Sequence, residues 1–75
     1  KMIYYYDIIP YSATSIYETT EAIEEATQKI RLVNPNCQID HIGGFLPLGI
    51  VRLSENDVKK INLPMAKLVK CEGQQ

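Results

Sequence analysis

The sequence predicts a single α+β domain whose elements follow the order β-α-β-β-α-β. A chain of 75 residues has room for one small hydrophobic core, so we expect one domain over residues 1–75. Two segments combine a capping residue with apolar positions that suit a helix, and four short apolar stretches lie between turn residues. Hydrophobic residues make up 45% and charged residues 23% of the chain, which is typical of a globular protein.

The first strand and the helix after it have clear boundaries. Residues 2–9 (MIYYYDII) are rich in β-branched and aromatic types, and large apolar side chains on both faces favour a central strand. Pro10 ends this strand because proline has no N–H for the ladder. Ser15 and Glu18 have the spacing of a capping box, so the long helix begins after Ser15. The sequence Asn-Pro-Asn at 34–36 ends it.

Two further strands are predicted in the middle of the chain. Residues 37–42 (CQIDHI) alternate between apolar and polar types, as in a strand with one solvated face. Gly43 and Gly44 predict a turn, and residues 45–47 continue the connection. Residues 48–53 (LGIVRL) form the returning strand.

The last third predicts a short helix and a final strand. Ser54 caps a helix over residues 55–61, with Asp57 as the capping-box partner. Leu53 and Val58 occupy the two positions of a hydrophobic staple, which fixes the entry of the helix. Residues 65–71 (MAKLVKC) then form the fourth strand.

Together these elements predict a four-stranded antiparallel sheet. Right-handed crossovers favour the strand order 4-1-3-2 with both helices on one face, which is the ferredoxin-like arrangement. Its two edge strands lie about 14 Å apart. Cys37 and Cys71 fall on opposite edges, and a disulfide needs Cα atoms within about 7 Å, so we expect two free thiols. Free thiols, with no signal peptide and no membrane-spanning run, predict a cytoplasmic protein without membrane contact.

No residue pattern predicts catalysis, a metal site or a cofactor. Cys37 and His41 share a face of their strand but lie about 13 Å apart, too far for a nucleophile and its base or for two ligands of one zinc ion. Asp40 lies on the opposite face from His41. The acidic residues between Glu18 and Glu25 are typical of a solvated helix face, and Gly43-Gly44 lacks the helix start of a phosphate loop. We therefore expect a protein that is not an enzyme.

Tyrosines raise the alternative of RNA binding, because RNA-recognition modules of this topology stack bases on sheet aromatics. Those modules place aromatics on strands one and three, and residues 48–53 contain none. The net charge of −1, from eight basic and nine acidic residues, also argues against a nucleic-acid partner. The tyrosines are Tyr4, Tyr5, Tyr6, Tyr11 and Tyr17.

Residues 49–72 join a strand, a polar cap, a short helix and a closing strand that ends near an acidic residue. This segment resembles the C-terminal half of subtilisin propeptides and of the stand-alone protease inhibitors related to them. The N-terminal half agrees only in topology, and its first strand is longer and more aromatic than is usual in that family. The positions that match in type and spacing are Leu53, Ser54, Val58, Ile61, Leu68, Val69 and Glu72.

The resemblance implies a non-catalytic protein-binding module that inhibits a subtilisin-type serine protease. In that family the sheet face packs on two protease helices, and the C-terminal tail enters the active-site cleft as an added strand. The partner-binding residues would be Tyr4 and Tyr6 of the first strand and the tail residues Lys70, Cys71, Glu72, Gly73, Gln74 and Gln75. The alternatives are a frayed tail, a homodimer contact on the sheet face, and a viral or mobile-element adaptor that binds a different protein through that face.

Overall fold

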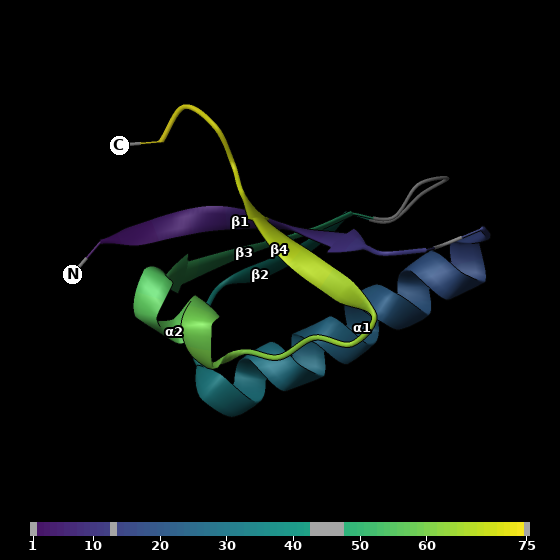
Figure 1. Ribbon diagram of the computed structural model, residues 1–75, viewed down its shortest axis with the longest axis horizontal. Helices are drawn as coiled ribbons and strands as arrows, with labels where there is room; N and C mark the ends of the chain where they lie inside the picture. Colours follow the sequence, from purple (N-terminus) through teal and green to yellow (C-terminus); the bar gives the residue numbers. More distant parts are fainter. Residues whose placement is uncertain (1, 13, 43–47, 75) are drawn as a thin grey trace.

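A computed structural model describes residues 2–12, 14–42 and 48–74 (Figure 1). Every pair of neighbouring strands is antiparallel, and the sheet order is β2-β3-β1-β4. This order is the predicted 4-1-3-2 read from the other edge, so the ferredoxin-like fold is confirmed. The predicted turn and connection at residues 43–47 lie outside the described residues. The elements are β1 (Ile3–Pro10), α1 (Ile16–Val33), β2 (Ile39–Ile42), β3 (Leu48–Ser54), α2 (Glu55–Lys60) and β4 (Ala66–Lys70).

The hydrophobic core lies between the sheet and the two helices, which Figure 1 shows on the same side. Inward-facing residues of β1 and β3 meet the apolar stripe of α1, and Val58 of α2 packs against the edge of this cluster. Full burial of one such side chain contributes about 1.5–3 kcal/mol. The buried core residues are Tyr6, Ile8, Ala22, Ile23, Ala26, Ile30, Cys37, Val51, Leu53 and Ala66.

Gly49 of β3 allows the sheet and α1 to pack closely at one point. A Cβ atom at this position would lie 3.0 Å from Cδ1 of Ile8 and 3.2 Å from Cγ2 of Ile23. Contacts this short force a neighbour to move. The absence of a side chain at Gly49 therefore leaves room for both isoleucines to fill the core.

The start of α1 confirms half of the predicted capping box. The Ser15 hydroxyl accepts a hydrogen bond from the Glu18 N–H at 3.1 Å. The Glu18 carboxylate, however, accepts from the N–H and hydroxyl of Thr14, at 3.0 and 3.1 Å, one residue before the expected partner. Those two hydrogen bonds hold the pKa of the Glu18 carboxyl below its ordinary value.

The start of α2 departs from its predicted box in a similar way. The Ser54 hydroxyl accepts from the Asp57 N–H at 3.2 Å, as expected. The Asp57 carboxylate instead accepts from the Asn34 side-chain amide at 3.2 Å. Since Asn34 is the C-terminal cap of α1, this bond ties the end of one helix to the start of the other. The short helix ends at Lys60, where the Ile61 N–H donates to the Val58 carbonyl.

All four strands differ from their predicted boundaries, by one residue at one or both ends in β1, β3 and β4 and by two at the start of β2. β2 begins at Ile39, two residues later than expected. Before it, the backbone groups of Cys37 bond outside the sheet: its N–H donates to the Asn34 carbonyl and its carbonyl accepts from the Arg31 guanidinium, both at 3.3 Å. β1 includes Pro10, which pairs with Ala66 as its last residue. A proline at the end of a strand costs no interior ladder bond.

Candidate functional site

The face of the sheet opposite the helices carries exposed apolar side chains, and we call this surface the open face. Strand alternation places Ile3, Tyr5 and Ile9 of β1 here, with 51% of Ile3 and 41% of Tyr5 exposed. Leu48 of β3 and Val69 of β4 extend the surface to the neighbouring strands, and both are exposed. Exposed apolar side chains gathered on one face of a sheet are a feature of protein-binding surfaces.

Charged groups of both signs lie among these apolar residues. The Arg52 guanidinium lies 5.3 Å from the centre of the Tyr5 ring, within the range of a cation–π contact. Lys67 pairs in register with Ile9, and Asp7 pairs with Val69. The open face therefore combines exposed apolar side chains with interspersed charges of both signs.

The tail after β4 folds back against β1. The Cys71 N–H donates to the Tyr5 carbonyl at 2.9 Å, which adds one bond to the ladder. The Gln74 side-chain amide then donates to the carbonyls of Tyr5 and Cys71 at 2.9 and 2.6 Å, and its oxygen accepts from the Tyr5 N–H. Gly73 makes this return possible with a φ of 81°, a conformation that glycine adopts without strain. The side-chain amide of Gln74 thus makes the two hydrogen bonds with Tyr5 that the backbone of a neighbouring strand would make.

The predicted partner-binding residues lie in three different environments. The Tyr6 side chain is 4% exposed in the core, and Tyr4 packs partly buried against the same cluster, so a partner on the open face meets Tyr5 in their place. The tail residues adjoin the N-terminal half of β1, with Glu72 and Gly73 exposed. Gln75 lies outside the described residues.

Lys70, which was predicted as a tail residue, also contacts the folded domain. Its ammonium lies 3.8 Å from the centre of the Tyr4 ring and 3.4 Å from the Glu55 carboxylate. An exposed ion pair of this kind contributes at most about 1 kcal/mol. The contacts nevertheless fix the end of β4 against the first turn of α2.

Both cysteines are free thiols. Cys37 is buried in the core, and this burial raises the pKa of its thiol despite the nearby Arg31. Cys71 is partly exposed, and desolvation together with the charge of Asp7 raises its pKa. A raised pKa keeps both groups as thiols, the less reactive form, at neutral pH.

His41 takes part in a structural hydrogen bond at the edge of the sheet. The Thr27 hydroxyl donates its proton to the Ile23 carbonyl at 2.8 Å, so it accepts from Nε2 of His41, also at 2.8 Å. This network assigns the proton to Nε2. Within residues 2–12, 14–42 and 48–74, no group of three or more His, Cys, Asp or Glu side chains is placed to hold a metal ion.

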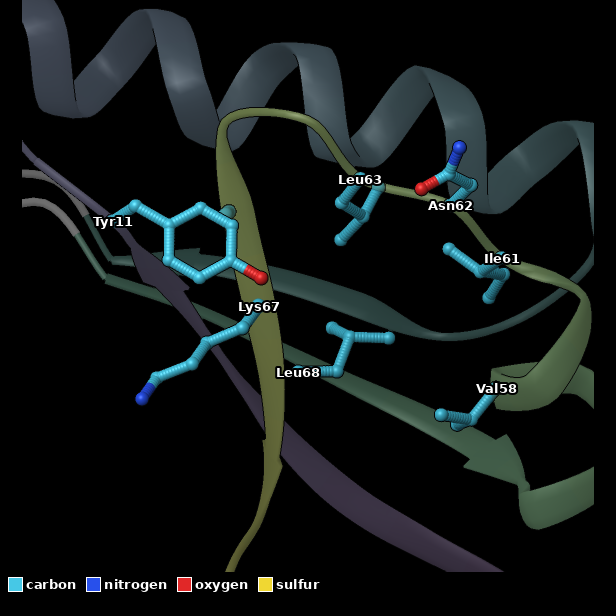
Figure 2. A pocket seen from close by; sticks show the side chains of 8 residues that line it. Tyr11, Val58, Ile61, Asn62, Leu63, Lys67 and Leu68 are labelled. Carbon is cyan, nitrogen blue, oxygen red and sulfur yellow. The ribbon is translucent and has the colours of Figure 1, made fainter.

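A groove of about 220 Å³ runs along β4, between this strand and the chain that leads from α2 to it (Figure 2). Figure 2 shows Ile61, Leu63 and Leu68 around its apolar centre, with Tyr11 and Lys67 at one end. The remaining lining residues are Val58, Asn62 and Ala66.

No family model, curated protein or solved structure matches this chain. No helix among the described residues is long and apolar enough to cross a membrane.

Sequence reasoning missed one residue of these surfaces and the contacts of another. Tyr5 could have been placed outward, because Asp7 shares its face of β1 and marks that face as solvated. Gln74 was predicted as a tail residue for partner binding, but no pattern predicted its hydrogen bonds to Tyr5, which lies 69 residues away in the chain.

Proposed function

We propose that this chain is a non-catalytic protein-interaction module that binds its partner with the open face and the adjoining C-terminal tail. The open face is the observation that carries the proposal, because Ile3, Tyr5 and Ile9 expose apolar surface that contributes nothing to the core. Charges of both signs among these residues match the polar groups expected in a protein interface.

The sharpest form of the proposal is a propeptide-like inhibitor of a subtilisin-type serine protease. Its support is the cap, staple and closing strand of residues 49–72, together with the closeness of the tail to the open face. One partner could therefore cover both. To enter a cleft as an extended strand, the tail must first release the Gln74 amide from Tyr5.

The second candidate is an adaptor that binds a non-protease partner through the open face alone. The folded tail favours this form, because the Gln74 amide already has three hydrogen bonds within the domain. Such a complex would form without any rearrangement of the tail. A second copy of the chain is one possible partner of this kind.

Titration against a subtilisin-type protease tests the proposal and separates its two forms. We would compare the full chain with a variant that ends at Lys70, which keeps all of β4. Tight inhibition by the full chain that weakens at least tenfold in the shortened variant is the result expected of the inhibitor. Rapid cleavage of the full chain, or no inhibition, contradicts that form. Sedimentation of the chain alone then tests for a homodimer on the open face.

A further inference from the structure

The outer edge of β4 leaves backbone hydrogen-bonding groups without a strand partner. The Tyr11 N–H bonds the Met65 carbonyl, and the Cys71 N–H bonds the Tyr5 carbonyl, so residues 65 and 71 turn their backbone groups toward β1. Strand alternation then directs the N–H and C=O groups of Ala66, Leu68 and Lys70 outward. Among the described residues, no hydrogen bond reaches these outward groups.

The groove of Figure 2 lies on the side of this edge to which the Leu68 side chain points, and strand alternation gives Ala66 the same side. A strand added to β4 would place residues opposite Ala66 and Leu68 with their side chains on that same side. Those side chains would enter the groove and contact Ile61 and Leu63. The intervening side chains would lie on the open face, next to Lys67.

The segment that leads to this edge and forms it carries only positive charges of its own, although one of its lysines, Lys70, is paired with Glu55. Residues 59–70 (KKINLPMAKLVK) contain four lysines and no acidic residue, although the whole chain has nine Asp and Glu. Lys59, Lys60 and Lys67 are all exposed. Lysines on an edge strand repel further basic segments and discourage self-pairing, and they attract an acidic one.

We propose that the outer edge of β4 and its groove form a strand-addition site for an extended, acidic segment of a protein partner in which acidic and apolar residues alternate. The backbone groups of Leu68 supply the central hydrogen bonds, the groove accepts the apolar side chains, and Lys67 pairs with an acidic one. This edge is separate from the tail contacts at Tyr5, so it can be occupied whether or not the proposed inhibitor function holds.

The probe is a short, end-blocked peptide of alternating glutamate and valine, titrated into the ¹⁵N-labelled full chain. We expect the largest amide shifts at Ala66, Leu68 and Lys70, with slower hydrogen exchange at Leu68 and Lys70. A peptide methylated on the backbone nitrogens that face β4 tests the geometry without altering the protein. It should bind up to about tenfold more weakly, since one net hydrogen bond contributes up to about 1.5 kcal/mol.

Charge variants complete the test. Lys67→Glu should weaken the glutamate–valine peptide about fivefold. Arg52→Glu makes the same change on β3, with β1 between it and the edge, and should leave binding within about twofold. No shift at millimolar peptide, equal binding of the methylated peptide, or shifts confined to β2 or the open face would each overturn the proposal.

Discussion

The two faces of β1 have similar composition and opposite roles. Tyr6 and Ile8 point toward the helices and are buried, whereas Tyr5 and Ile9 point the other way and are exposed. Burial of the inner pair stabilises the domain, but exposure of the outer pair contributes no such energy and adds a risk of aggregation. Residue type alone therefore does not say which face of a strand holds the fold together and which is available to a partner.

Removal of a core side chain should give the largest effect of any single change. Ile30→Ala leaves a cavity under the sheet and should cost about 2–5 kcal/mol in the free energy of unfolding. Leu32→Ala, on the same helix but 83% exposed, should change it by less than about 0.5 kcal/mol. Urea denaturation followed by circular dichroism measures the stability of both variants. Equal destabilisation by the two would contradict the claim that the buried side chains hold the fold together.

The two helix caps extend the comparison of buried with exposed groups to smaller changes in the free energy of unfolding. Ser54→Ala should destabilise the domain by about 1–2 kcal/mol, because the Ser54 side chain is buried and caps the short helix. Ser15→Ala removes an equivalent hydrogen bond at an exposed position and should cost about 0.5–1 kcal/mol. Chemical denaturation would contradict this ranking if the exposed cap proved the more costly to remove.

Loss of the Gln74 amide should loosen the tail and leave the domain folded. In Gln74→Ala the Tyr5 N–H loses its acceptor, so its hydrogen exchange should speed up at least tenfold, while the midpoint of urea unfolding changes little. Glu72→Ala is the matched control, since Glu72 is an exposed residue of the same tail. Unchanged exchange at Tyr5 would show that Gln74 does not hold the tail in solution.

The smallest expected effect is on the pH dependence of stability, and it comes from Glu18 at the start of α1. Hydrogen bonds from Thr14 lower the pKa of Glu18, so this carboxylate stabilises the folded state at pH values above its ordinary pKa. That contribution is lost as pH falls through the lower pKa of the folded state. Melting temperatures at pH 6 and pH 3 should therefore fall less on acidification in Glu18→Gln than in the unaltered chain. Glu21→Gln, on the same helix, serves as the control, and identical pH responses of all three proteins would contradict the assignment.

The fold was predictable because local signals agree along the chain. Caps at Ser15 and Ser54, alternation in the strands and the turn residues each favoured the same order of elements. The partners of Glu18 and Asp57 were not predictable, since a carboxylate near a helix start can reach several donors. The late start of β2 accompanies hydrogen bonds from Cys37 to Asn34 and Arg31, which no local residue pattern predicted.

The candidate surfaces were less predictable than the fold. Sequence alone proposed Tyr4 and Tyr6 for binding. Both faces of the first strand carry large apolar side chains, so the sequence did not show which face the helices would bury. The groove along β4 depends on the path from Ile61 to Leu63 over the edge of the sheet, which has no local pattern. Tertiary packing decided each of these features.

The most direct test of the central claim compares the stability and the binding of one open-face variant. The double change Tyr5→Thr and Ile9→Thr keeps strand-forming residues but removes apolar surface. We predict a free energy of unfolding within about 1 kcal/mol of the unaltered chain, and at least tenfold weaker inhibition of a subtilisin-type protease. Unchanged inhibition, or destabilisation as large as that of Ile30→Ala, would contradict the claim that the open face serves a partner and not the fold.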